Sequence, residues 1–149
     1  MKKFSFVLTA AALLLAPVSH AQVRDERLLW PLAAALETKD ARQRLDGTVK
    51  FFFGDQPHPA VVKGFGGFGK NLRTHSFNRT PQEACNWVFL SNMLELQKRA
   101  RQAGANAVVN IVSHDGEAPL SSATEFVCRK VGIQAGVGLK GDLVTIADQ

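Results

Sequence analysis

The side chains best suited to chemistry lie in the segment His114-Asp115-Gly116-Glu117. An imidazole beside two carboxylates offers either an acid–base pair or a set of metal ligands. His58, with Asp55 close by in the sequence, is a further candidate ligand from a second loop. Polar loops of this kind are usually solvated. The main hypothesis is therefore a solvated hairpin loop. The alternative hypothesis is a metal site built from His114, Asp115 and His58.

A second segment, Gly64-Phe65-Gly66-Gly67-Phe68-Gly69-Lys70, is similar in composition to phosphate-binding loops. It lacks the four-residue gap between the required glycines, and no Ser or Thr follows Lys70, so it does not meet the P-loop pattern. The sequence also contains no Gly-x-Ser-x-Gly turn that would present a nucleophilic serine. We therefore expect a non-enzymatic protein that uses no cofactor.

The glycine segment has two structural interpretations. In the first, it is a bulged or bent strand in which Phe65 and Phe68 pack inward while the glycines allow curvature. In the second, the two phenylalanine rings are exposed between the glycines and form a surface for a partner. We take the bent strand as the main prediction and keep Phe65 and Phe68 as a candidate partner surface.

Cys85 and Cys128 are the two cysteines of the chain. An oxidising compartment favours their pairing, and neither has a second Cys or a His beside it at metal-ligand spacing. A tight hairpin around Pro119 would set Cys128 beside Ala107, beyond the roughly 7 Å limit for bridging to Cys85. A wider loop would set Cys128 opposite Ser113 and permit the bond. We predict the disulfide Cys85–Cys128, which requires the wider loop.

Residues 1–21 have the three parts of a cleavable signal peptide. Lys2-Lys3 precede an apolar stretch over residues 4–16, and Ser19-His20-Ala21 place small residues at both positions read by the peptidase. The apolar stretch is about half as long as the roughly 20 residues needed to cross a bilayer. We expect cleavage after Ala21 and a periplasmic or secreted protein without a stable membrane span.

The charge pattern argues against nucleic-acid binding. The chain has a formal charge of +5, and its basic residues are scattered. The densest group is Lys98, Arg99 and Arg101 near the end of a predicted helix. A group of this size is typical of a solvated helix face and not of a phosphate-binding patch.

A long helix is the clearest predicted element. Thr80 can cap it, Glu83 is placed to complete a capping box, and Gly104 is placed to end it, so the helix should span residues 81–103. Trp87 is interpreted as a residue that packs in the core or against the helix, with ligand stacking as the lesser alternative. The apolar stripe of the helix consists of Cys85, Phe89, Met93, Leu96 and Ala100.

The order of the remaining elements indicates an α+β fold, with one long helix packed on a mostly antiparallel sheet and a short N-terminal helix. We expect residues 22–46 to form an N-terminal arm, mobile over 22–27 and helical over 31–37, and residues 47–149 to form one domain. Extended segments are predicted at 49–53, 60–63 and 106–113. Residues 124–128 and 131–146 should together supply two or three more strands.

Three segments carry a resemblance to a known family: Phe52-Phe53-Gly54-Asp55, Glu83-Ala84-Cys85, and residues 106–111. Through them, nearly the whole mature chain resembles short exported bacterial proteins that are called excinuclease ATPase subunits. The sequence lacks the phosphate-binding loop and the Cys-rich zinc modules of a repair ATPase. The resemblance therefore implies an exported domain without the activity in that name.

A wider resemblance covers residues 80–146. Gly104-Ala105-Asn106-Ala107-Val108-Val109, followed by the glycine-containing segment 131–146, is similar to YbjQ-type domains and to RcsF-like envelope sensors. The resemblance to YbjQ-type domains implies heavy-metal binding, although the cysteines here are not clustered. The resemblance to RcsF-like sensors implies an envelope domain held by disulfides. We predict a binding or structural envelope module whose partner is an unidentified envelope protein or small ligand. A metal- or ligand-binding protein that uses the His114 loop is the alternative.

Overall fold

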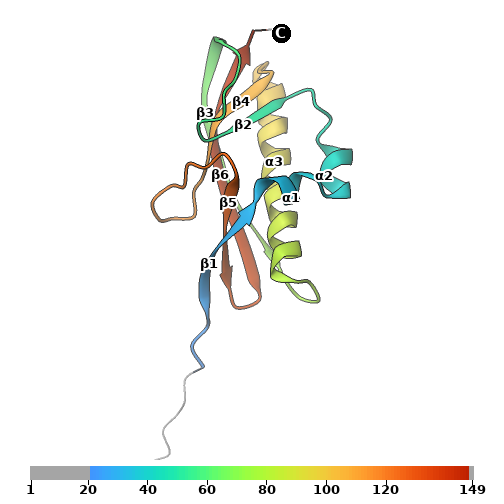
Figure 1. Ribbon diagram of the computed structural model, residues 1–149, viewed down its shortest axis with the longest axis vertical. Coiled ribbons are helices and arrows are strands. Elements are labelled where there is room, and N and C mark those ends of the chain that lie inside the picture. The colour runs from blue at the N-terminus through green and yellow to red at the C-terminus, as the bar shows by residue number, and fades with distance from the viewer. Residues whose placement is uncertain (1–20, 148–149) are drawn as a thin grey trace, which may run out of the picture.

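A computed structural model describes residues 21–147 of the chain (Figure 1). The predicted signal peptide falls almost entirely on residues 1–20, outside the described part. No helix within residues 21–147 is long and apolar enough to cross a membrane. The α+β class is confirmed. The elements are β1 (Asp25–Pro31), α1 (Leu32–Leu36), α2 (Lys39–Arg44), β2 (Lys50–Phe53), β3 (Val61–His75), α3 (Pro81–Ala103), β4 (Ala107–Ser113), β5 (Glu125–Val131) and β6 (Gln134–Ile146).

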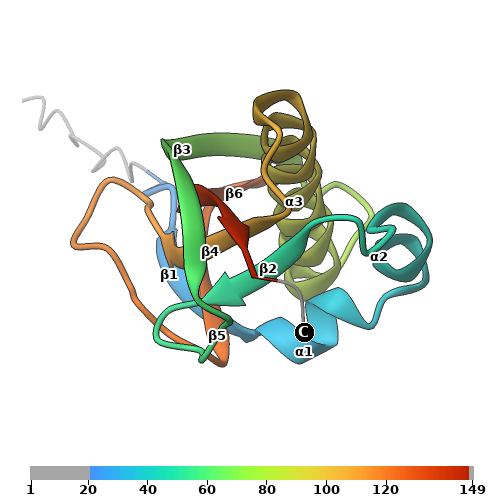
Figure 2. The ribbon, with the colours of Figure 1, turned by 90° about the horizontal axis from the view of Figure 1, so that it is seen from above.

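Strand β6 organises the sheet. Along one edge it pairs antiparallel with β3 over its whole length, and along the other it pairs antiparallel first with β5 and then with β4. β5 continues to β1 in antiparallel fashion, whereas β4 continues to β2 in parallel. The six strands form a curled half-barrel on one side of α3 (Figure 2).

Helix α3 begins and ends as predicted. Glu83 N donates to Thr80 Oγ1 at 3.2 Å, and Thr80 N donates to Glu83 Oε2 at 2.8 Å, which completes the capping box. Gly104 ends the helix with φ +80°, in the left-handed region that glycine adopts at little cost. The predicted apolar stripe is buried against the sheet. The Phe89 ring centroid lies 4.4 Å from that of Phe126.

The disulfide Cys85–Cys128 is present and joins α3 to β5. The two Cα atoms are 5.8 Å apart, and both side chains are fully buried in the main core. Val127 N donates to Ser113 Oγ at 2.9 Å, so Cys128 lies close to the level of Ser113, as the wider loop requires. The segment between β4 and β5 is therefore not a tight hairpin.

The predicted mobility of residues 22–27 is wrong for residues 25–27, because they begin strand β1. β1 pairs with β5 from Asp25 opposite Val131 to Pro31 opposite Glu125. The segment has a polar sequence because its outward side chains, Asp25 and Arg27, are charged. Each forms an ion pair with a residue far along the chain, Asp25 with Arg129 and Arg27 with Asp115. The short helix α1 is smaller than predicted, since Pro31 ends the strand. Helix α2, capped by Thr38, was not predicted.

The glycine segment forms part of one long strand, β3, and the bent-strand prediction is confirmed. The register against β6 shifts between Val61 and Lys63 and again between Gly64 and Gly67. Gly66, between the second pair, has φ +91°, a conformation that favours glycine. Residues 134–146 likewise form a single strand, because their glycines lie within the ladder and do not interrupt it.

Candidate functional site

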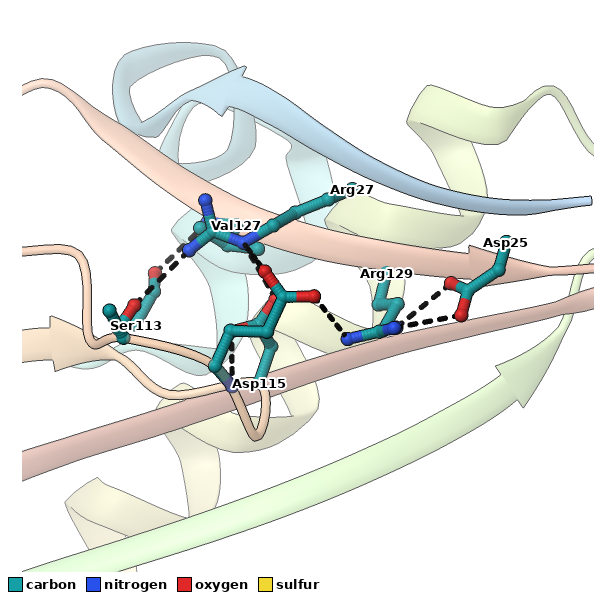
Figure 3. A network of polar contacts seen from close by, with 8 residues as sticks. Asp25, Arg27, Ser113, Asp115, Val127 and Arg129 are labelled. Carbon is teal, nitrogen blue, oxygen red and sulfur yellow. Dashed lines mark hydrogen bonds and ion pairs between the residues drawn. The ribbon is translucent and has the colours of Figure 1, made fainter.

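The loop that carries His114 and Asp115 is held in place by charge pairs (Figure 3). Arg27 Nε on β1 donates to Asp115 Oδ2 at 2.8 Å, and the Asp115 side chain is only 3% exposed. His114 is exposed, and its backbone N–H donates to Gly138 O at 2.9 Å. Asp115, which the sequence suggested as a metal ligand, thus accepts a hydrogen bond from the Arg27 guanidinium.

Arg129 on β5 extends this network. Its guanidinium donates to both carboxylate oxygens of Asp25, at 2.8 and 2.7 Å, and to Glu117 at 3.0 Å. The hydrogen bonds to Asp25 raise the pKa of Arg129 and lower the pKa of Asp25. The network joins β1, β5 and the loop after β4 on one face of the sheet, which indicates a structural role.

We expect D115N to lower the free energy of unfolding by about 1 to 2 kcal/mol at neutral pH, because it removes the charge that Arg27 binds. Burial opposes ionisation of Asp115, but the hydrogen bond and charge of Arg27 outweigh it and hold its pKa below the ordinary value of an aspartate. The folded-state pKa is lower than the unfolded one, so this stabilisation is present above the unfolded pKa and is lost as pH falls through the folded one.

The measurement is urea unfolding of wild type and D115N between neutral pH and about pH 2, a range that spans ordinary aspartate titration. The difference between the two proteins should be constant near neutrality and should disappear in acid. A difference that persists unchanged in acid would show that Asp115 stabilises the fold by packing and not by its charge.

The structure does not assemble His58 with the His114 loop into a metal site. His58 is exposed, its ring centroid is 5.5 Å from that of Phe52, and Nδ1 lies 2.8 Å from Pro59 O. Within residues 21–147, no three His, Cys, Asp or Glu side chains are grouped so that they could hold a metal ion. His114, Asp115 and His58 therefore do not share a ligand set in this fold.

Phe65 and Phe68 are half-buried and pack against the main core. Each ring nevertheless lies beside a cation: Lys63 Nζ is 5.0 Å from the Phe65 centroid, and Arg99 Cζ is 5.7 Å from the Phe68 centroid. The two rings are therefore core residues whose outer parts take part in a charged surface.

The fold brings the glycine segment next to the basic end of α3. Phe68 and Lys70 from β3 meet Lys98 and Arg99 from α3 around a shallow cleft of about 240 Å³, which Glu95 and Gln102 complete. We call Phe68, Lys70, Lys98 and Arg99 the basic patch. None of its three cations forms an ion pair in the part of the chain that the structure describes.

Arg101, the third basic residue of the helix end, has a different role. It donates to Asp46 and to Thr48 Oγ1 and thereby joins the end of α3 to the segment before β2. Hydrogen bonds from Thr48, and then from Arg101, lower the pKa of Asp46 to about 2. Arg101 is thus satisfied within the fold and does not belong to the basic patch.

A third feature is Trp87, which was predicted mainly as a core or helix-packing residue and which the structure leaves partly exposed. Trp87 is 39% exposed on α3, and two guanidinium groups lie near its ring, those of Arg44 and Arg79 at 5.9 and 5.4 Å from the centroid. It lines a cleft of about 380 Å³. Arg44 lies on α2, which was not predicted, so no sequence signal connected it with Trp87.

Comparison of the chain with protein-family models, with curated proteins and with solved structures gives no match. The resemblances stated from the sequence therefore stay predictions.

Proposed function

We propose that the chain is an exported, non-enzymatic binding module that docks an acidic protein of the cell envelope. The observation that carries the proposal is the basic patch, where three cations without ion-pair partners in the described residues line one cleft with Phe68 and a single carboxylate, Glu95, and where Arg99 lies over the Phe68 ring. Like charges held close together repel one another, so a partner that brings carboxylates to them is favoured electrostatically.

The patch also offers an apolar contact beneath the charges. Phe68 packs against the core on one side and lies beside the Arg99 guanidinium on the other. Aromatic residues and arginine are enriched in protein interfaces, where arginine binds carboxylates in a bidentate manner. This composition suits a protein surface on which acidic residues flank an apolar side chain.

The disulfide supports the exported location. Cys85 and Cys128 are fully buried and paired, and disulfides persist mainly in oxidising compartments such as the periplasm or the extracellular space. This agrees with the predicted signal peptide.

The proposal is tested with immobilised poly-L-glutamate, which imitates an acidic protein surface, at low ionic strength. We expect K70E/R99E to bind at least tenfold more weakly than wild type, because two attractive charges of the patch become repulsive. Affinity is measured by biolayer interferometry across a salt series, since interactions between exposed charges weaken with ionic strength.

The matched control is K39E/R42E, which changes the net charge equally but lies at two exposed positions of α2. It should retain most of the wild-type affinity. If both double variants lose affinity to the same degree, the binding reports overall charge, and the basic patch is not a docking site.

A further inference from the structure

The cleft beside Trp87 forms where α2 and the turn before α3 meet the first half of α3. Its volume of about 380 Å³ falls in the range of small-molecule sites, about 300 to 1,000 Å³. Hydroxyl, carboxylate, amide, guanidinium and indole groups line it together. The lining residues are Thr38, Asp40, Asn78, Arg79, Glu83, Asn86, Trp87 and Leu90.

The exposed indole is the first indication of a ligand. The residues that follow Trp87 on α3, Val88 to Leu90, are each at most 2% exposed, whereas Trp87 is 39% exposed and faces the cleft. A tryptophan left partly in water offers a large, rigid contact surface to a bound molecule.

The two arginines are the second indication. Arg79 lines the cleft, whereas Arg44 on α2 lies beside it. Each guanidinium lies over the Trp87 ring within 6 Å of its centroid, which orients it by cation–π attraction. Neither side chain makes an ion pair or hydrogen bond to another described residue. Their N–H groups are therefore available to an anion.

The carboxylate of Glu83 is held by the N-terminus of α3, and the charge of Arg79 also acts on it. It accepts the backbone N–H of Thr80 in the capping box, and this hydrogen bond, with that of the Thr80 hydroxyl, lowers the pKa of Glu83. The remaining acid in the cleft, Asp40, lies in the first turn of α2 and can accept hydrogen bonds from hydroxyl groups.

From this arrangement we propose that the Trp87 cleft binds an acidic saccharide. Arg79, with Arg44 beside the cleft, takes its carboxylate. The apolar C–H surface of the sugar contacts the part of Trp87 that the two guanidinium groups leave exposed, and Thr38 and Asp40 bind its hydroxyl groups. A sugar acid combines in one compact molecule the negative charge, the apolar C–H surface and the many hydroxyls that these groups complement. The site is separate from the basic patch and does not rest on the function proposed above.

The experiment titrates the wild-type mature protein with trigalacturonate and with its methyl ester, which keeps the rings and removes the charges. Binding is followed by calorimetry and by tryptophan fluorescence. We expect the acid to bind at least tenfold more tightly than the ester. R79Q should weaken binding of the acid at least tenfold, and W87F should weaken binding and abolish the fluorescence change.

R42Q is the matched control, because Arg42 is exposed on the same short helix as Arg44 and does not line the cleft. It should bind like wild type. The proposal is overturned if wild type shows no saturable binding of trigalacturonate, if the ester binds equally well, or if R79Q binds as tightly as wild type. Circular dichroism of R79Q and W87F separates a lost site from a lost fold.

Discussion

Removal of the disulfide by C85A/C128A is expected to lower the free energy of unfolding by about 3 to 4 kcal/mol. The bond closes a loop with a sequence separation of 43 residues, so it removes much conformational freedom from the unfolded chain. It also joins α3 to β5 inside the main core, where both sulfur-bearing side chains are fully buried. Against a typical total of about 5 to 15 kcal/mol, this is a large share of the stability of a small domain.

The measurement is guanidinium unfolding of the oxidised wild type, the reduced wild type and the double variant. Reduction should destabilise the wild type by nearly the same amount as the double substitution, and reductant should leave the variant unchanged. A loss of less than about 1 kcal/mol in the variant would show that packing of α3 on the sheet, and not the covalent bond, holds these elements together.

Replacement of Gly138 by alanine is expected to destabilise the protein by about 3 kcal/mol, through overpacking against backbone that must move. A Cβ atom at this position would clash with the carbonyl oxygen of His114. The same contact region contains the hydrogen bond from His114 N to Gly138 O, by which the loop after β4 is joined to β6. The alanine variant cannot keep both the bond and its own side chain in place.

Gly64→Ala is the matched control for this substitution. Gly64 also lies in a long strand of the same sheet, but a Cβ atom there would have no heavy atom within 4 Å, and its φ is not positive. Thermal unfolding should show a clear drop in Tm for G138A and little change for G64A. Equal and small changes in both variants would mean that the loop moves away from β6 at little cost.

The two proposed binding surfaces have separate tests. The basic patch combines the end of α3 with β3, whereas the Trp87 cleft combines the start of α3 with α2. K70E/R99E leaves every residue of the cleft intact, and R79Q leaves the basic patch intact. Each proposal can therefore fail without affecting the other.

Several local features were determined by the sequence alone. The span of α3 followed from Thr80, Glu83 and Gly104, because a capping box and a left-handed terminal glycine act within one helical turn. The bend in β3 followed from its glycines, and the disulfide followed from the presence of two cysteines in a chain with a predicted signal peptide. Such features need only neighbouring residues or a unique partner, so sequence patterns report them well.

Only the tertiary structure decided which distant residues meet. β1 forms a strand because it pairs with β5, which lies about 100 positions away along the chain. This pairing brings Asp25 to Arg129, and Arg27 binds Asp115, the predicted metal ligand, 88 positions away. The same holds for Phe68 beside Arg99 and for Trp87 near Arg44. These contacts depend on strand order and on how α2 and α3 pack. Residue types along the chain do not specify them, because many different pairings would satisfy the same charges and bury the same apolar surfaces, and only the folded structure has one of these pairings.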